Sequence, residues 1–117
     1  MKKILVVDDE ANVAASVRLV LEGAGYAVDT CRTAAECTRH VGRWRADAYL
    51  LDVRLPDGNG IDLLRLVHQK FPQAPIVMIS GHATIADAVS ATRAGAFDFL
   101  EKPLGRDRLL LVLANAL

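Results

Sequence analysis

Short apolar runs alternate along the chain with longer stretches in which apolar residues recur every three or four positions. The runs are rich in valine, isoleucine and leucine, and turn-forming residues bound them, which is typical of buried β-strands. They predict five strands, at residues 3–8, 26–30, 48–52, 75–80 and 96–101. The stretches that follow each strand predict five helices, so strand and helix alternate over the whole chain.

Three of the predicted helices each place their apolar residues on one face, which we expect to pack on the sheet. The face residues are Val13, Val17, Val20, Leu21 and Ala24 in the first helix, Ile61, Leu64, Val67 and Phe71 in the third, and Ile85, Ala88, Val89 and Thr92 in the fourth. Two helix starts are also marked in the sequence. Thr33 with Glu36, and Thr84 with Asp87, have the spacing of capping boxes.

The alternation of strands and helices predicts an α/β fold with parallel βαβ units and right-handed crossovers. The first, third and fourth strands are apolar almost throughout, as central strands covered on both faces should be. The strand at 26–30 is shorter and more polar, which suits an edge. A length of 117 residues fits a single domain over residues 1–117.

Composition excludes several classes of protein. Lysine plus arginine and aspartate plus glutamate both number 14, so nothing indicates a nucleic-acid surface or a polybasic membrane patch. No apolar run is long enough for a membrane span, and the start of the chain does not resemble a secretion signal. Cys31 and Cys37 have neither zinc-site nor CxxC spacing, so we expect reduced thiols in a cytoplasmic protein.

Polar residues stand at the carboxyl ends of four predicted strands. Asp8 and Asp9, followed by Glu10, end the first strand, and Asp52 ends the third. Ser80 ends the fourth strand, and Lys102 follows the fifth. In an open parallel sheet ligands bind outside the carboxyl ends of the strands. If these strands are neighbours, carboxylates, a hydroxyl and an ammonium share one shallow cleft.

Clustered carboxylates repel one another and need a cation to stay ionised. Mg²⁺ is the natural choice for oxygen donors, Mn²⁺ could replace it, and the absence of His and Cys at these strand ends argues against zinc or copper. A carboxylate beside such a metal can attack phosphorus and form an aspartyl phosphate. Lys102 would supply positive charge to the phosphoryl group, and Ser80 a hydrogen-bond donor.

Each of these residues also has a simpler explanation. Asp8 and Asp9 could cap the first helix, and Asp52 could be an ordinary turn residue. Lys102 could be a surface lysine. The shared cleft is favoured because all of these groups stand at the same ends of their strands.

The segments VVDDE, LLDVRLPDGNG, MISGHAT and GAFDFLEKP, taken together and in this order, resemble the receiver domain of bacterial two-component response regulators. The resemblance covers essentially the whole chain. It implies a doubly wound, flavodoxin-like receiver fold, in which a five-stranded parallel sheet of order 2-1-3-4-5 is covered by five helices.

The resemblance also implies roles for individual residues. Asp52 would be the phosphoacceptor. Asp9 and Asp52 would bind Mg²⁺ directly, together with the backbone carbonyl of Arg54, and Asp8 would act mainly through water.

Other positions of the resemblance concern switching and the lifetime of the phosphoryl group. Lys102 would pair with phosphoryl oxygens, and its bond to Pro103 is expected to be cis. Ser80 would be the hydroxyl that moves toward the phosphoryl group, and Phe99 the aromatic residue that rotates inward. Arg54 and His82 occupy positions that influence how fast the phosphoryl group is lost, although His82 could equally be a solvated loop residue.

A receiver implies partners, which here would be a sensor histidine kinase and an output domain. The output face would lie within residues 84–117, and a homodimer through this face is a further expectation. The final helix has five consecutive apolar residues at 109–113, more than one buried face needs. The excess indicates either a partner or a longer helix that would cover it.

The run SGHATIADAVSATRAGAFDFLEKPL is most similar to receivers of sigma-54-dependent activators of the nitrogen-regulation type. This would imply an AAA+ domain and a helix-turn-helix downstream and control of transcription, with no direct contact between this domain and nucleic acid. We therefore interpret the chain as the receiver module of a longer regulator. A natural single-domain receiver is the alternative.

Three other functions compete with this interpretation. A Mg²⁺-dependent phosphohydrolase of the haloacid-dehalogenase kind needs an acid two residues after its nucleophile, where this chain has Arg54. A nucleotide-binding domain needs a glycine-rich phosphate loop, which DGNGID is not. A docking module that is never phosphorylated would normally have lost an acid or the lysine. We expect slow self-dephosphorylation but no enzymatic turnover of a free substrate.

Overall fold

The computed structural model describes all residues from Met1 to Leu117 and contains one five-stranded parallel sheet. Its strands are β1 (Lys3–Val7), β2 (Ala27–Cys31), β3 (Ala48–Asp52), β6 (Ile76–Ser80) and β7 (Asp98–Glu101). They lie in the order β2-β1-β3-β6-β7. Because β6 and β7 are the fourth and fifth strands of this sheet along the chain, the predicted order 2-1-3-4-5 is confirmed, with 26–30 at an edge.

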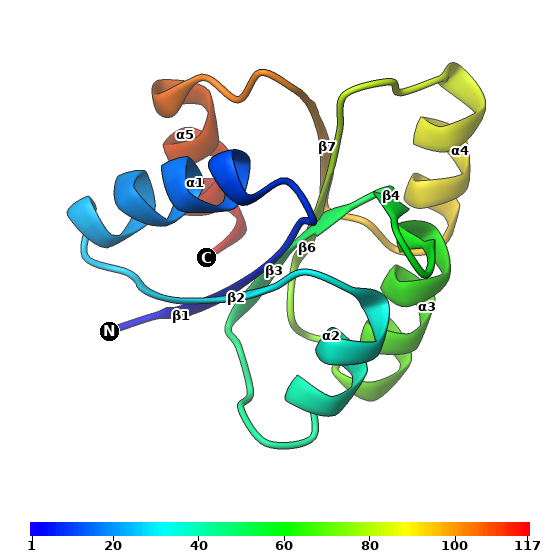
Figure 1. Cartoon of the computed structure of the whole chain (residues 1–117), viewed down its shortest axis with the longest axis horizontal. Coiled ribbons are helices and arrows are strands. Elements are labelled where there is room, and N and C mark those ends of the chain that lie inside the picture. Colours follow the sequence, from blue (N-terminus) through cyan, green and yellow to red (C-terminus); the bar gives the residue numbers. More distant parts are fainter.

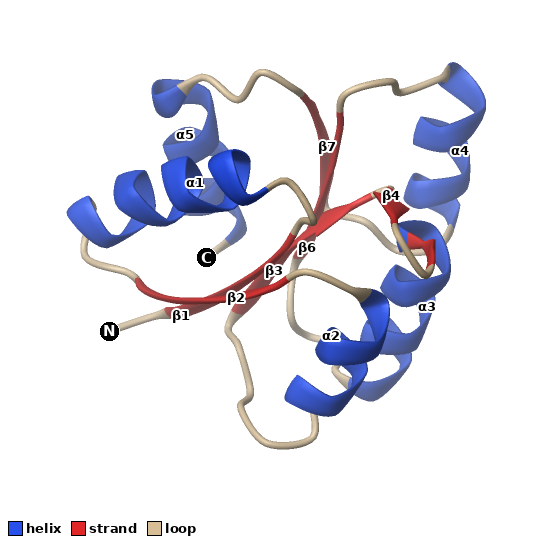
Figure 2. Cartoon of the chain, viewed as in Figure 1, coloured by secondary structure: helices blue, strands red, loops and turns tan.

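Five helices cover the two faces of the sheet, as the doubly wound fold predicts (Figure 1). They are α1 (Ala11–Gly23), α2 (Ala34–His40), α3 (Gly60–Lys70), α4 (Ile85–Arg93) and α5 (Arg106–Ala116). Helices α1 and α5 lie on one face, and α2, α3 and α4 lie on the other (Figure 2). None of them is long and apolar enough to cross a membrane.

Each face of the sheet has its own hydrophobic core. Under α1 and α5 the core includes Val17, Leu21, Leu109 and Leu113. Under α2, α3 and α4 a larger core forms, and half-buried Trp44 and Phe99 pack against it. The central strand β3 is buried along its entire length, which explains why its sequence shows no alternation of apolar and polar residues.

The fourth helix differs from the sequence prediction. Its expected core face is largely exposed: Ile85 is 86% and Val89 42% accessible, and Thr92 is also at the surface. The only fully buried side chain of α4 is Ala91. Helix α4 therefore packs on the sheet through small residues. Hydrophobic periodicity predicted the helix correctly, but the face that it marked as buried is the exposed one.

The helix starts were predicted with mixed success. Thr84 and Asp87 form the predicted capping box, with both reciprocal hydrogen bonds present. At α2 the Thr33 hydroxyl accepts from the Glu36 amide, but the Glu36 carboxylate accepts from the amide of Arg32 rather than that of Thr33. Thr33 is therefore an N-cap without the reciprocal half of a box.

A small antiparallel pair, β4 (Arg54–Leu55) and β5 (Gly58–Asn59), follows β3 and was not predicted. Two-residue strands are too short to show any periodicity. The pair folds residues 53–60 into a compact loop, which the Gly60 amide closes by donating to the Val53 carbonyl at 2.7 Å.

Candidate functional site

The sheet places the predicted site residues at one edge. Asp8 directly follows β1, Asp52 ends β3, Ser80 ends β6 and Lys102 directly follows β7. Backbone hydrogen bonds fix these strand ends to one another, since the Lys102 amide donates to the Ser80 carbonyl at 2.8 Å and the Val53 amide to the Ile79 carbonyl at 3.0 Å. Strand β1 pairs with β3 as far as Val7 and Leu51, so the carboxyl ends of β1, β3, β6 and β7 meet, as the sequence led us to expect.

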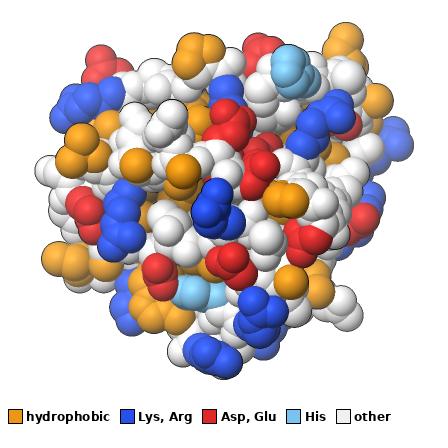
Figure 3. Space-filling view, in the orientation of Figure 1, with side chains coloured by type: hydrophobic (Ala, Val, Ile, Leu, Met, Phe, Trp, Pro, Cys, Tyr) orange, Lys and Arg blue, Asp and Glu red, His pale blue; other side chains and the backbone are white.

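Burial separates these groups from ordinary surface residues. Asp8 is 0%, Ser80 1% and Asp52 4% accessible. No other charged, amide-bearing, serine or threonine side chain of the protein is buried. Elsewhere charges of both signs are interspersed over the surface, as one face of the molecule illustrates (Figure 3). Buried carboxylates are costly unless they are paired, so these residues are placed for more than helix capping.

Lys102 provides the pairing. Its Nζ lies 2.9 Å from Asp8 Oδ2, 2.9 Å from Glu10 Oε1 and 3.0 Å from Asp52 Oδ2. Burial acts to lower the pKa of Lys102, but the contacts with the three carboxylates outweigh it and raise that pKa well above its usual value. The ammonium is therefore fixed as a cation between the acids.

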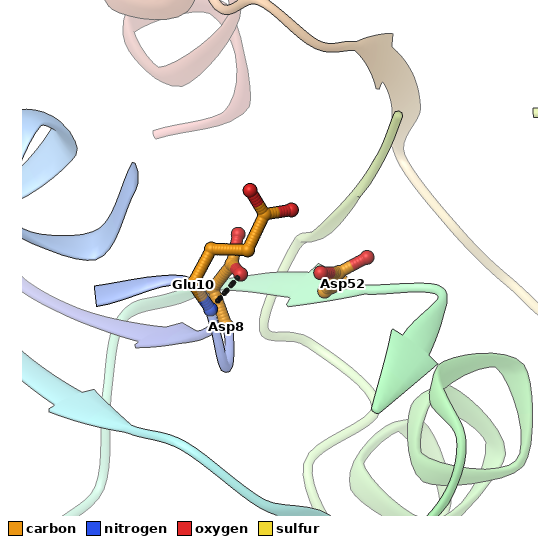
Figure 4. A group of neighbouring side chains, drawn as sticks. All are labelled: Asp8, Glu10 and Asp52. Carbon is orange, nitrogen blue, oxygen red and sulfur yellow. Dashed lines mark hydrogen bonds between the residues drawn. The ribbon is translucent and has the colours of Figure 1, made fainter. Parts of the chain in front are cut away.

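The acids themselves form a tight group. Oxygen atoms of Asp8, Glu10 and Asp52 all lie within 4.8 Å of one another, and the three side chains project from the same edge of the sheet (Figure 4). Burial is the main reason that the pKa of Asp8 is raised. Three carboxylates face a single ammonium, so the group is negative overall.

These donors suit a hard divalent cation. All are carboxylate oxygens, and the buried Asp8 Oδ2 makes no hydrogen bond although the Lys102 ammonium is near it. Mg²⁺ is normally held by one or two carboxylates together with water and phosphate oxygens. The residues therefore fit the metal that the sequence predicts.

The structure places Glu10, rather than Asp9, in this acidic group. Asp9 is half-buried in the turn after β1 and is not one of the three acids within 4.8 Å of one another. The sequence put Glu10 at the same edge but gave it no role. Its contact with Lys102 joins residues 92 positions apart, so no local pattern could have revealed it.

The other predicted positions surround the acids. The Arg54 amide donates to Asp52 Oδ1 at 3.2 Å, while the Arg54 side chain is exposed. The His82 amide donates to the Ser80 hydroxyl oxygen at 3.2 Å, and the His82 side chain is exposed as well. Phe99 is half-buried, and the Lys102–Pro103 peptide bond is cis.

Glycine is required where the loop returns to β3. A Cβ atom at Gly60 would stand 1.8 Å from the carbonyl oxygen of Asp52 and 2.9 Å from Cα of Val53. No side chain can be accommodated there without moving backbone. The loop after Asp52 is thus packed directly on the backbone of the residue that carries the central carboxylate.

Comparison with known proteins agrees with this geometry. The response regulator receiver domain family matches residues 4–114. The nitrogen assimilation regulatory protein NtrX of Azorhizobium caulinodans is 39% identical over an alignment of 116 positions, which covers 97% of this chain and 26% of that protein. The alginate biosynthesis transcriptional regulatory protein AlgB of Pseudomonas putida is 38% identical over 115 residues, which are 98% of this chain and 26% of that protein.

A solved structure shows the same fold. The beryllofluoride-activated NtrC4 receiver domain dimer superimposes with a TM-score of 0.94 at 36% identity, covering 99% of this chain and 96% of that one. The present chain spans about a quarter of the length of the two curated relatives. The acidic edge, the doubly wound sheet and these matches together identify the chain as a member of the response regulator receiver domain family, a phosphorylation-controlled signalling switch.

Proposed function

We propose that Asp52 accepts a phosphoryl group from a sensor histidine kinase. The observation that carries this proposal is the position of its carboxylate, which is buried at the end of β3 and lies 3.0 Å from the Lys102 ammonium beside Asp8. In the transfer, a carboxylate oxygen of Asp52 forms a bond to phosphorus as the phosphorus–nitrogen bond of a phosphohistidine breaks. The imidazole leaves with the bonding electron pair.

A bound Mg²⁺ would supply positive charge to the carboxylates and to the phosphoryl oxygens. Asp8, Asp9, Asp52 and the backbone carbonyl of Arg54 are the groups proposed to hold it. Mn²⁺ suits the same oxygen donors. Lys102 would exchange its contact with Asp52 for one with the phosphoryl oxygens, and its flexible side chain allows that exchange without movement of β7.

Ser80 and Phe99 are proposed to convert phosphorylation of Asp52 into a conformational change at the protein surface. The Ser80 hydroxyl is buried at the same edge and would turn toward a phosphoryl oxygen as a hydrogen-bond donor. Phe99 lies on β7, pairs with Met78 of β6 and packs against the core under α2, α3 and α4, and we propose that it follows a movement of the loop after β6. The Arg54 amide donates to Asp52 and the His82 amide to Ser80, and the side chains of Arg54 and His82 are proposed to set how readily water reaches the phosphoryl group.

The surface formed by α4, β7 and α5 is the proposed output face. Ile85, Val89, Phe97 and Leu111 are exposed there. Exposed apolar residues that gather on one surface indicate a contact site. We propose that phosphorylation promotes a homodimer through this face, which the dimeric state of the NtrC4 receiver structure supports.

We further propose that the domain controls transcription through an output domain of a longer regulator in the cytoplasm. The relatives include a transcriptional regulatory protein about four times as long as this chain. The similarity to nitrogen-regulation receivers favours a sigma-54-type output with an AAA+ domain and a helix-turn-helix. The receiver itself would act as a signalling domain and turn over no free substrate.

The proposal is tested by the intact mass of the protein after incubation with a small-molecule phosphodonor, with and without Mg²⁺. We expect the gain of one phosphoryl group that requires Mg²⁺ and is absent in Asp52→Asn. No gain in a folded protein that binds Mg²⁺ would instead favour a docking module that is never phosphorylated. Continuous release of phosphate from the donor, without a stable adduct, would favour the phosphohydrolase.

A further inference from the structure

Asp57 stands outside the acidic group, yet it makes a contact that none of the functions above uses. It lies at the tip of the loop between β4 and β5, and its side chain is at the surface. Its Oδ1 accepts from the Ala34 amide at 2.8 Å and its Oδ2 from the Ala35 amide at 3.0 Å. One carboxylate thus joins the loop after the phosphoacceptor to the first turn of α2, 22 and 23 residues earlier in the chain.

The contact satisfies donors that the helix itself cannot satisfy. The first amides of a helix have no partner within it. At α2 the Thr33 hydroxyl accepts only from the Glu36 amide, which leaves those of Ala34 and Ala35 to Asp57. Hydrogen bonds from these two amides are the main reason that the pKa of Asp57 is lowered, so the side chain is a carboxylate at neutral pH.

The other end of the loop is attached to Asp52. Arg54 pairs with Asn59 in the β4–β5 ladder, and its amide donates to Asp52 Oδ1. Gly60 closes the loop against the Asp52 carbonyl, where no Cβ fits. The loop is therefore short, internally bonded and packed on backbone, and a shift at its tip is transmitted to Arg54.

We infer that Asp57 is a positioning residue for the Mg²⁺ site: by fastening the loop to α2, it sets the place of the Arg54 carbonyl and amide next to Asp52. This inference rests on the proposed metal site, but not on transfer of a phosphoryl group. Residues that orient metal ligands from outside commonly change metal affinity by about tenfold or more when they are replaced. Asp57 acts through several bonds, so we expect an effect near the lower end of that range.

The test compares Asp57→Ala with Asp57→Asn and with Asp62→Ala. Asp62 is an exposed acid at the start of α3 that pairs only with Arg65, so its loss changes the net charge equally without touching the loop. Affinity is measured by titrating each protein with MgCl₂ and following the amide signals of Arg54 and Asp52 by NMR. Amide exchange of Ala34 and Ala35 is measured in the metal-free proteins.

We expect Asp57→Ala to bind Mg²⁺ about tenfold more weakly, with a shifted Arg54 amide and faster exchange at Ala34 and Ala35. Asp57→Asn, which keeps one acceptor oxygen, should recover part of the affinity, and Asp62→Ala should match the unaltered protein. Faster exchange at Ala34 and Ala35 with unchanged Mg²⁺ affinity and an unshifted Arg54 amide would overturn the inference and leave Asp57 as a helix cap. Failure of the proposed function would appear separately, as absence of phosphorylation in the unaltered protein.

Discussion

Lys102 Nζ lies 3.0 Å from Oδ2 of Asp52, and the two residues, fifty positions apart, meet because β3 and β7 both flank β6. The same ammonium contacts Asp8 and Glu10. It is the single cation among three acids, two of which are buried. The stability of this edge without metal therefore depends on Lys102.

Replacing Lys102 by methionine, which is similar in size, should lower the free energy of unfolding by about 3 kcal/mol in the absence of Mg²⁺. The reason is that buried carboxylates lose their only positive partner. Added Mg²⁺ should stabilise Lys102→Met more than the unaltered protein, because the metal no longer competes with an ammonium. Urea unfolding with and without Mg²⁺ measures both effects. Lys2→Met, at an exposed position, is the control, and equal losses in the two variants would refute the pairing.

Gly60 should tolerate no larger residue. Gly60→Ala places a Cβ atom against the Asp52 backbone, and overpacking against atoms that cannot move away should cost about 3 kcal/mol. Gly58→Ala is the matched control in the same loop, because a Cβ atom there meets nothing within 4 Å. We expect that control to change stability by less than about 0.5 kcal/mol. The melting temperatures of the two variants measure this difference. Equal melting temperatures would show that the loop moves to accommodate the Cβ atom and would contradict the prediction.

The corrected orientation of α4 has its own consequence for stability. Ile85→Asp should leave the free energy of unfolding within about 0.5 kcal/mol of the original value, because that side chain is almost fully exposed. Ala91→Asp should cost about 3 kcal/mol or more, since it buries an unpaired carboxylate. If the originally predicted face were the buried one, Ile85→Asp would be strongly destabilising.

Ile85→Asp also tests the output face. If phosphorylation joins two copies through α4, β7 and α5, this variant should accept a phosphoryl group normally yet fail to dimerise. Sedimentation velocity on the beryllofluoride-treated protein provides the measurement. Undiminished dimerisation of the variant would place the contact elsewhere.

The two cysteines should be unreactive while the protein is folded. Burial raises the pKa of Cys31 to about 11 and that of Cys37 to about 12. A thiol becomes nucleophilic only as pH rises toward its pKa, so at pH 8 about one part in a thousand or less is thiolate. A chromogenic disulfide reagent at pH 8 should therefore react slowly with the native protein and rapidly in guanidinium. Fast reaction of the native protein would mean that β2 and α2 open readily.

The sequence was most informative where structure follows from periodicity and chain order. Five strands, five helices and the meeting of Asp8, Asp52, Ser80 and Lys102 at one edge could all be predicted, because the carboxyl ends of parallel strands must share that edge. Strand ends were less certain, since β7 begins at Asp98 rather than at residue 96. The acidic edge is thus a product of topology, which a residue pattern can reveal.

Features that depend on long-range contact or on small residues could not be predicted. The placement of Glu10 beside Lys102 and the capping of α2 by Asp57 need three-dimensional proximity. The orientation of α4 follows from alanines, which carry too little hydrophobicity to outweigh Ile85 and Val89 in a periodic pattern. The sequence therefore predicts where the site lies, but not the contacts that hold its residues in place.

The most direct test of the central claim is to locate the modified residue. The protein is treated with a phosphodonor and Mg²⁺, reduced with borohydride, which converts an aspartyl phosphate to homoserine, and digested for peptide mass spectrometry. The account predicts homoserine at position 52 and at no other aspartate, Asp8, Asp9 and Asp57 included. Homoserine at another position, or its absence in a protein that has gained phosphoryl mass, would contradict the assignment of Asp52 as the acceptor.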